Sequence, residues 1–416
     1  MKLPKKWRAH IAGLALFSWP AWAGAQGSDS LTLEEALRRS GALGVEQAEI
    51  ANPRVVAPQQ DVAAAEALVG QADLRPNPEV SLEVENVAGT GAFSGLRATE
   101  YTLAAELPLE LGGKRRARVE AARAELTVAQ LRGNLALAEL GFMVRQRYLA
   151  AVAAQARVEL YEDILERNRE LARIAGVLVE TGREPPLRAM RARAELAETE
   201  AELKAAQAEA LAARFGLASL WGQDAPPMVS ASFPEIRPPH ELLAAYEGLQ
   251  TQLASAERAA AEAAVARERT LRIPDPTVSA GVKRFEESDD QAFVVGVSVP
   301  LPFWNRNQGN IAAAQARARA ATAREAVALA DYRQAVAQAR ADYLSAEAKA
   351  QTLADESLPQ AEEALRLAEI GYRNGRFPLI EVLAAAEARD DIRRALIDAR
   401  EMQGRAAARL IRLAAQ

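Results

Sequence analysis

Two proline-terminated segments of this chain share one pattern, and that pattern limits the folds open to it. The segment LRPNPEVSLEVEN at residues 74–86 is nearly repeated as LRIPDPTVSAGVK at residues 271–283. Each follows an alanine-rich helical stretch, which the prolines end because proline lacks a backbone N–H and disfavours helix in the preceding residue. Alternating polar and apolar residues come next, and a period of two is typical of a strand with one apolar and one polar face. The chain is therefore predicted to build the same helix-to-strand junction twice.

Three landmarks recur in the same order along the chain. RPNP pairs with IPDP, ELPLELGG with SVPLPFWN, and ETGREPPL with RNGRFPLI, at offsets of 198, 192 and 193 residues. Near-constant spacing of this kind indicates an internal duplication. We predict a first repeat over residues 30–224, a proline-rich linker over 225–239, and a second repeat over 240–416.

Each repeat is predicted to contain a helix, a β-hairpin, a long helix and a return helix. In the first repeat the hairpin covers residues 79–108, the long helix 113–179 and the return helix 187–220; in the second they cover 277–299, 308–371 and 379–414, after a helix beginning at His240. No proline interrupts residues 113–179. At about 1.5 Å per residue, a helix of that length is a rod of roughly 100 Å, whereas helices of globular domains are short. The predicted fold class is mostly α with a small β part.

Composition agrees with long helices and excludes several kinds of site. Half of the residues are hydrophobic but only 5% are aromatic, and a chain dominated by Ala, Glu, Arg and Leu at helical spacing is typical of coiled coils. There is no cysteine, which excludes disulfides, thiolate metal sites and a lipid on an N-terminal cysteine. The formal net charge of −5 does not favour nucleic acid as a partner.

The first 23 residues predict export from the cytoplasm. A basic segment is followed by a short apolar run, residues 11–19, and by the small-residue pattern Ala21-Trp22-Ala23. This order is typical of a signal peptide cleaved after Ala23 or, as a second choice, after Ala25. The apolar run is too short to span a bilayer, and no later stretch has eighteen consecutive apolar residues.

The hairpins suggest how such a chain could meet a membrane. Their strands have about the nine residues that a tilted strand needs to cross an outer membrane. Four strands cannot close a barrel, and open edges are not tolerated in hydrocarbon. Three copies would supply twelve strands around an open bore, whereas two would supply eight, whose interior fills with side chains. We therefore expect a homotrimer in contact with outer-membrane lipid.

At these residues the sequence resembles the TolC-like outer-membrane efflux family, from LTLEEAL to the C-terminus. More narrowly, LRPNPEVSLEVEN, LPLELGGKRRARVEAARAEL and PLPFWNRNQGNIAAAQARARA resemble the outer-membrane subunit of cobalt–zinc–cadmium efflux systems. The resemblance implies a homotrimer with a twelve-stranded outer-membrane barrel and a periplasmic helical barrel. It implies a passive exit duct, joined by a periplasmic membrane-fusion adaptor to an inner-membrane resistance–nodulation–division pump. Many relatives carry a lipid on an N-terminal cysteine, which this chain lacks.

The polar face of the two predicted hairpins is the candidate lining of the bore. It carries Glu79, Glu83, Glu85, Glu100 and Glu106 in the first hairpin and Lys283 in the second. If this face is the lumen, three copies make an acidic bore, which lowers the barrier to cations. The alternative is that these are only solvent-exposed strand positions.

The chain reverses at two predicted helical tips, ETGREPP and RNGRFP. Gly182 and Gly375 supply the backbone conformations that a tight turn between helices needs. The family resemblance implies that these tips meet the adaptor. Gly182, Arg183, Gly375, Arg376 and Phe377 are then the candidate contact residues.

The resemblance also places a constricting ring of polar residues just beyond the tips. By spacing from GYRNG, Glu381 stands where the family often has a gating acid, whereas Ala384 departs from a common acidic choice. Arg188 and Arg191 occupy the matching places in the first repeat. A mixed ring of Arg188 and Glu381 could hold the tip closed through ion pairs. The alternative is an ordinary charged surface, because solvated pairs contribute little.

Residues for catalysis or metal binding are poorly represented. Apart from His10 in the predicted signal peptide, His240 is the sole histidine. No cofactor, preformed metal site, nucleophile motif or phosphate-binding loop is predicted, so enzyme activity is not expected. Two other functions remain open: a duct for organic drugs or for type I protein secretion, and a soluble periplasmic coiled-coil scaffold or adaptor.

Overall fold

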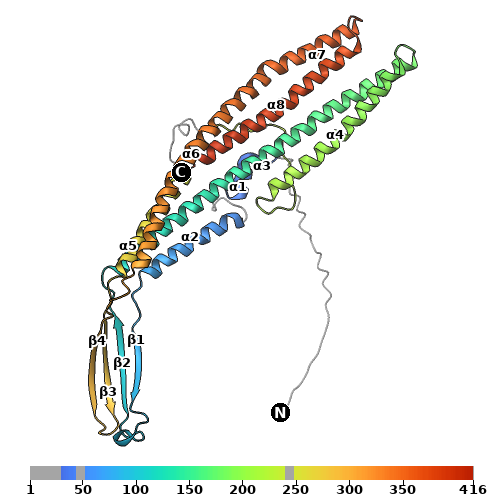
Figure 1. Cartoon of the computed structure of the whole chain (residues 1–416). Coiled ribbons are helices and arrows are strands. Elements are labelled where there is room, and N and C mark those ends of the chain that lie inside the picture. The colour runs from blue at the N-terminus through green and yellow to red at the C-terminus, as the bar shows by residue number, and fades with distance from the viewer. Residues whose placement is uncertain (1–29, 44–51, 239–247, 416) are drawn as a thin grey trace, which may run out of the picture.

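The computed structural model describes residues 30–43, 52–238 and 248–415, and it is an elongated molecule (Figure 1). A β-sheet forms one end, and two helical hairpins reach away from it to the other end. The predicted signal peptide, with cleavage after Ala23 or Ala25, lies outside the described residues, as does the segment 240–247 of the helix expected to begin at His240. Within the described ranges, no helix is both long enough and apolar enough to cross a membrane.

The two repeats share the order of a helix, two strands, a long helical stretch and a return helix. The first contains α1 (Leu33–Ser40), α2 (Pro53–Ala72), β1 (Glu79–Glu85), the short 3₁₀ helix η2 (Gly91–Phe93), β2 (Glu100–Pro108), α3 (Lys114–Glu180) and α4 (Pro186–Ala218). The second contains α5 (Leu249–Thr270), β3 (Thr277–Phe285), β4 (Gln291–Ser298), α6 (Gln308–Thr352), the π-helical segment η4 (Leu353–Ser357), α7 (Leu358–Arg373) and α8 (Leu379–Leu413). The predicted class, a mostly helical chain with a small β part, is confirmed.

The long helix of the second repeat differs from the uninterrupted helix expected over residues 308–371. The five-residue π segment separates α6 from α7, and Pro359 lies within the first turn of α7. Proline has no N–H to donate and its ring crowds the carbonyl four residues earlier, so a helix that contains proline must adjust locally. The preceding helix also differs, because Gly248 is in an extended conformation and α5 begins only at Leu249.

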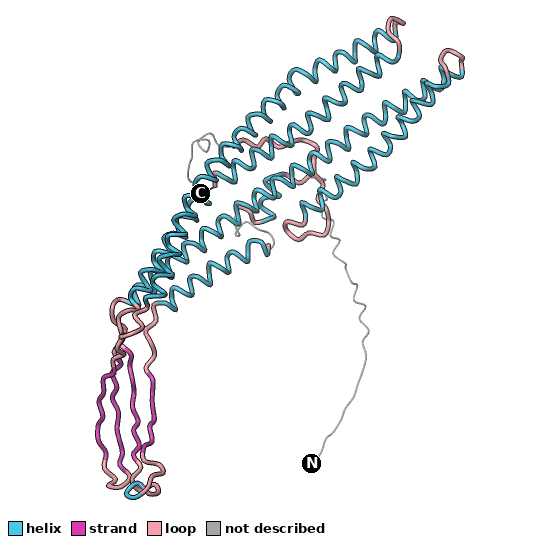
Figure 2. The backbone as a smooth tube through the Cα atoms, viewed as in Figure 1, coloured by secondary structure: helices cyan, strands magenta, loops and turns pink. Residues whose placement is uncertain are grey.

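One antiparallel sheet joins the two repeats, with strand order β1-β2-β3-β4 (Figure 2). The pairing of β2 with β3 connects the two hairpins, and Leu103 lies between Leu82 of β1 and Val282 of β3. Because side chains alternate across a strand, this register fixes which residues share a face. The sheet does not close on itself, so β1 and β4 are edge strands.

The helices pack through small, separate cores. In the first repeat, Leu140, Val144 and Tyr148 of α3 pack with Leu217 of α4 and with Trp221. In the second, Tyr332 and Ala339 of α6 pack with Ala407 and Leu410 of α8. The buried tyrosine hydroxyls are satisfied: Tyr148 donates to the Leu31 carbonyl at 2.9 Å, and Tyr332 to the Leu413 carbonyl at 3.0 Å. Alanine at many contact positions lets the helices lie close together, and the rods stay thin.

Candidate channel surfaces

The register places all six predicted lining residues on one face of the sheet, which we call the polar face. Glu79 lies directly opposite Glu106, Glu83 opposite Thr102, and Glu85 opposite Glu100. Lys283 lies opposite Thr102 from the other side. The first glutamate pair is at the helical end of the sheet and the second at the end far from the helices. Two like charges directly opposite each other are unfavourable unless they are compensated.

Lys283 compensates the far pair. Its Nζ lies 2.6 Å from an oxygen of Glu85 and 2.7 Å from an oxygen of Glu100. The three side chains come from β1, β2 and β3, and the ammonium therefore holds the first-repeat hairpin against the first strand of the second repeat. At the helical end, Glu106 accepts a hydrogen bond from Ser81 Oγ at 3.1 Å. The two facing glutamate pairs thus differ in their partners, a hydroxyl at one end and an ammonium at the other.

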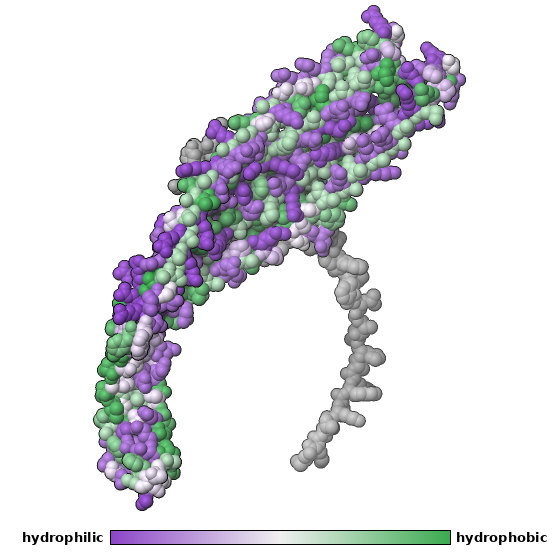
Figure 3. All heavy atoms as spheres, in the orientation of Figure 1, coloured by the Kyte–Doolittle hydropathy of each residue, from purple (hydrophilic) through white to green (hydrophobic). Residues whose placement is uncertain are grey.

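The opposite face of the sheet is exposed and mostly apolar, with Arg284 and Gln291 at its far end. Phe293 is 90% exposed, Val295 80%, Val80 75% and Leu82 66%. In Figure 3 apolar side chains run along the sides of the sheet, whereas the helices show a mixed surface. An exposed apolar surface of this extent is unfavourable in water and indicates a contact with lipid or protein.

The two tips have the same backbone hydrogen bonds at equivalent positions. Gly182 and Gly375 have φ of 67° and 70°, the left-handed region that favours glycine. Residue 183 donates to the carbonyl of residue 178 at 2.9 Å, and residue 376 to that of 371 at 2.8 Å. Both predicted turns are present, and the predicted contact residues Gly182, Arg183, Gly375, Arg376 and Phe377 are exposed.

Side chains at equivalent positions of the two tips behave differently. In the first tip, Glu184 forms an ion pair with Arg188 at 3.0 Å. The equivalent residue of the second tip is Phe377, whose ring lies against Gly371, so that a Cβ at Gly371 would overlap it. The same turn is therefore supported by charges in one repeat and by an aromatic ring in the other.

The predicted gate residues lie at the starts of α4 and α8. Arg191 and Glu381 are exposed, and Arg188 is half-buried. In the described part of the chain, Arg188 forms its ion pair with Glu184 of its own helical turn. The tips that carry Arg188 and Glu381 are apart in Figure 1 and Figure 2. Within one chain these two side chains are therefore not brought together.

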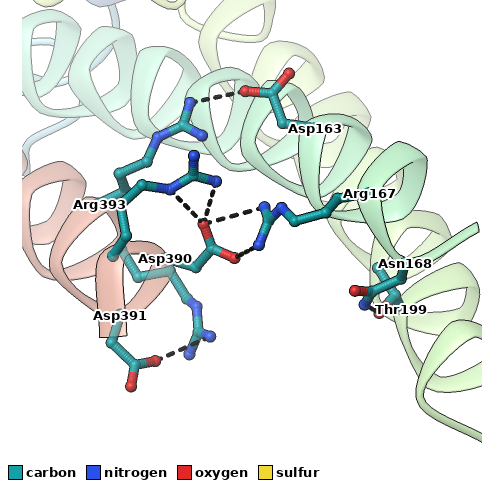
Figure 4. Close-up of polar contacts among 9 residues, drawn as sticks. Asp163, Arg167, Asn168, Thr199, Asp390, Asp391 and Arg393 are labelled. Atoms are coloured by element: carbon teal, nitrogen blue, oxygen red, sulfur yellow. Dashed lines mark hydrogen bonds and ion pairs between the residues drawn. The ribbon is translucent and has the colours of Figure 1, made fainter. Parts of the chain in front are cut away.

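A seam of ion pairs between α3 and α8 joins the repeats, and the sequence did not predict it. The Asp390 side chain is buried, and its carboxylate accepts from Arg167 of α3 at 2.5 and 3.2 Å and from Arg389 at 2.8 Å (Figure 4). One turn along α8, Arg393 pairs with Asp163 at 2.9 Å. A buried carboxylate is costly unless it is paired, so Asp390 requires its arginines.

The seam continues toward the middle of the rod. Arg157 of α3 contacts Asp398 at 2.7 Å and Glu401 at 3.1 Å on α8. Burial lowers the pKa of Arg157, but these two carboxylates outweigh burial and the pKa is raised. On the other side of α3, Asn168 donates a buried hydrogen bond to Thr199 of α4 at 2.9 Å (Figure 4). The long helix α3 is thus held by polar contacts on two sides.

Near the tips, α4 carries an acidic residue that the sequence did not single out. Burial raises the pKa of Glu195, and the nearby charges of Glu387 and Glu198 raise it further. Glu387 belongs to α8, so acidic groups from the two hairpins influence each other here. No group of three or more His, Cys, Asp or Glu side chains is placed to hold a metal ion among residues 30–43, 52–238 and 248–415.

An open sheet with one apolar and one polar face, continued by two long helical hairpins, defines the TolC-like class of outer-membrane channels. A membrane protein from Pseudomonas aeruginosa has this fold, with a TM-score of 0.77 at 21% identity over 99% of this chain and 96% of that chain. CusC has a TM-score of 0.75 at 19% identity, covering 92% of each chain. VceC from Vibrio cholerae has a TM-score of 0.72 at 21% identity, covering 92% of this chain and 94% of that chain.

The chain belongs to the outer membrane efflux protein family, whose model matches residues 44–223 and 245–416. It is 33% identical over 368 residues to the cobalt-zinc-cadmium resistance protein CzcC of Cupriavidus metallidurans, covering 85% of this chain and 83% of that protein. It is 35% identical over 275 residues to the nickel and cobalt resistance protein CnrC of the same organism, covering 65% of this chain and 66% of that protein. The resemblance found in the sequence is thereby confirmed, and it is to efflux channels rather than to enzymes.

Proposed function

We propose that this protein is the outer-membrane channel of a tripartite efflux pump and a passive exit duct for divalent heavy-metal cations. The cargo is proposed from the relatives, whose names are those of cobalt, zinc, cadmium and nickel resistance proteins. The chain would be exported by its signal peptide, with the sheet in the outer membrane and the helices in the periplasm. Partners would be a membrane-fusion adaptor and an inner-membrane resistance–nodulation–division pump.

The observation that carries the proposal is the sheet with an exposed apolar face, an acidic polar face and two unpaired edges. Lipid would accept the apolar face but not the open edges, because unpaired backbone groups are costly in hydrocarbon. Pairing β1 of one copy with β4 of the next removes every edge, and three copies would close a twelve-stranded barrel with a water-filled bore. The polar face would line this bore, where its carboxylates favour cations.

The exposed tips are proposed to meet the adaptor. Both present an arginine beside a glycine turn, Arg183 in one and Arg376 in the other, and the second adds Phe377, which is 48% exposed. An exposed aromatic side chain with adjacent arginines is typical of residues that dominate protein interfaces. The driving force for export would come from the partner pump.

The ring beyond the tips is proposed to control opening. Glu381, Arg188 and Arg191 would face the tube near its narrow end, with Glu381 of one copy near Arg188 of a neighbouring copy. Single-channel conductance of Glu381→Gln and Arg188→Gln tests this proposal, since both should raise the open probability. Unchanged conductance and open probability in both variants would contradict the gate assignment.

Metal accumulation in a deletion strain tests the proposed function. The strain should accumulate more cobalt, zinc or cadmium than its parent, and the wild-type gene should restore export; nickel, copper and silver serve as comparison ions. If the strain instead becomes sensitive to organic drugs, or stops secreting a protein, the cargo is a drug or a protein and not a metal ion. Fractionation must also place heat-modifiable trimers in the outer membrane, because a soluble periplasmic monomer would indicate a scaffold instead.

A further inference from the structure

We propose that Lys283 is a tethered cation that prevents the far end of the polar face from retaining the exported metal. The inference rests on the proposed function, in which this face lines the bore. It concerns one cluster, the ammonium of Lys283 with the carboxylates of Glu85 and Glu100. We call this cluster the mouth triad, because it lies at the end of the sheet away from the helices (Figure 1).

The geometry of the mouth triad leaves the facing oxygens of the carboxylate pair occupied. The Lys283 ammonium lies between one oxygen of Glu85 at 2.6 Å and one of Glu100 at 2.7 Å. The other oxygen of Glu100 accepts a hydrogen bond from Asn86 at 3.4 Å. Thr102 and Ala292 are the register neighbours of Lys283 and carry no charge. Lys283 is the one Lys or Arg on the polar face, whose strand positions all belong to the described part of the chain.

The helical end of the same face has an equivalent pair without a lysine. Glu79 and Glu106 are direct register partners, and the donor described above for Glu106 is the neutral hydroxyl of Ser81. The formal charge therefore falls from −2 at this pair to −1 at the mouth triad. Glu83 also lies in the far half of this face, opposite Thr102, so the difference is confined to the two facing pairs: one has a cation between its carboxylates and the other does not.

A cation held between the carboxylates of the far pair suits a duct for divalent cations. Conduction requires that an ion be attracted into the bore and also released from it. Two carboxylates facing each other across neighbouring strands are a ready pair of oxygen ligands for a divalent ion. An ammonium held between them competes for the same oxygens, and its charge repels the approaching cation. Because the ammonium is covalently attached to the chain, it is present each time a metal ion passes through the bore.

A purely structural role is the competing explanation, since Lys283 also links three strands. The two roles separate when charge and hydrogen bonding are changed independently. Lys283→Arg keeps a cation that can bridge both carboxylates. Lys283→Met removes the cation but keeps a side chain of similar length. Lys283→Gln removes the charge while retaining a hydrogen-bond donor across the strands. It takes the place of Lys283→Met in the experiment if Lys283→Met does not form heat-stable trimers.

The experiment uses the full-length protein in planar bilayers under a KCl gradient, with CdCl₂ as the blocking ion. Lys283→Met and Lys283→Gln should lengthen cadmium block events at least about tenfold, because two charge-assisted hydrogen bonds no longer compete for the carboxylates. Their reversal potentials should shift toward greater cation selectivity. Lys283→Arg should behave as the wild type. Adding Glu85→Gln and Glu100→Gln to Lys283→Met should restore brief block events.

Two results would overturn the inference while leaving the duct intact. One is a conducting Lys283→Met or Lys283→Gln channel whose cadmium block matches the wild type. The other is prolonged block that persists after both glutamates are replaced, which would place retention elsewhere. Glu79→Gln is the matched control at the other end: it should reduce cation selectivity without lengthening block. A deletion strain that accumulates no more metal than its parent would overturn the proposed function itself, and the inference with it.

Discussion

The first tip, between α3 and α4, and the second tip, between α7 and α8, are built on one backbone plan with different side chains. The backbone N–H groups of residues 181–184 and of residues 374–377 donate to carbonyls at equivalent positions of the two tips. Even the first polar side chain is equivalent, since Thr181 donates to the Val177 carbonyl at 2.9 Å and Asn374 to the Ile370 carbonyl at 2.8 Å. The turns differ at the next positions, where Glu184 binds Arg188 and Phe377 covers Gly371.

The difference shows that the glycine and the proline set the path of the chain, while the neighbouring side chains are free to diverge. It also extends along the rods. The helix entering the first tip is a single 67-residue α3, whereas the helix entering the second contains the π segment near Pro359. The two hairpins are linked by the seam from α3 to α8 and by apolar contacts such as that of Leu171 with the second hairpin. The two tips are therefore equivalent as turns and different as surfaces.

The largest expected effect comes from breaking the seam. Asp390→Ala should lower the free energy of unfolding by about 3 kcal/mol or more, because Arg167 and Arg389 would lose the buried carboxylate that compensates them. Thermal unfolding in detergent measures this. Asp391→Ala is the matched control, since Asp391 is exposed and pairs with Arg394 of its own helix at 3.0 Å; it should cost under about 0.5 kcal/mol. If the two variants lose the same free energy of unfolding, the buried ion pairs of the seam do not link the hairpins.

The aromatic support of the second tip can be broken alone. Gly371→Ala should cost about 1–3 kcal/mol, because the added methyl group must displace the ring of Phe377. Gly176→Ala, near the first tip, meets nothing within 4 Å and should stabilise α3 by about 0.5–1 kcal/mol. Unfolding curves of the two variants should therefore shift in opposite directions. If both variants are stabilised, the ring of Phe377 moves away from residue 371 without cost.

The equivalence of the two turns predicts equal costs at the two left-handed glycines. Gly182→Ala and Gly375→Ala should each lose about 1–2 kcal/mol, since both positions have φ near 70°. Thermal unfolding of each single variant and of the pair measures this, and the two losses should add because the tips are separate. Clearly unequal losses would mean that the turns are not interchangeable.

The smallest effect concerns pH. Because the pKa of Glu195 is raised in the folded chain, folding favours its neutral form, and its charge becomes unfavourable as pH rises through that raised pKa. Glu195→Gln should therefore stabilise the protein slightly at about pH 8, by up to roughly 0.5 kcal/mol for a side chain that still reaches solvent, and have no effect at about pH 4. Glu200→Gln, on the same helix, removes a carboxylate 3.8 Å from Arg169 and should not stabilise at either pH. A gain for Glu195→Gln that is the same at both pH values would contradict this assignment.

Local sequence patterns predicted the elements and the faces of the strands. Period-two alternation placed Glu79, Glu83 and Glu85 on one side, and the register agrees. Pro359 is also visible in the sequence and could have revealed the break before α7, because proline inside a helical pattern removes a hydrogen bond and crowds the preceding turn. The two glycines of the tips were similarly readable from their turn sequences.

Long-range pairing was not readable in the same way. Lys283 meets Glu85 and Glu100 only because β2 pairs with β3, and nothing local to either hairpin specifies that neighbour. Asp390 lies in an alanine-rich helix with many charged residues, so its spacing did not reveal that α3 supplies its partner. The position of Phe377 on Gly371 depends on how one ring packs after the turn has formed.

The unpaired edges of the sheet have a consequence for the life of the protein before assembly. A single chain in water would present free backbone groups on β1 and β4 beside exposed Phe293, Val295 and Val80. Such a surface is a template for uncontrolled strand addition and aggregation. A folded copy that has not yet met its neighbours is therefore at risk of aggregation, and expression faster than assembly should drive this protein out of solution.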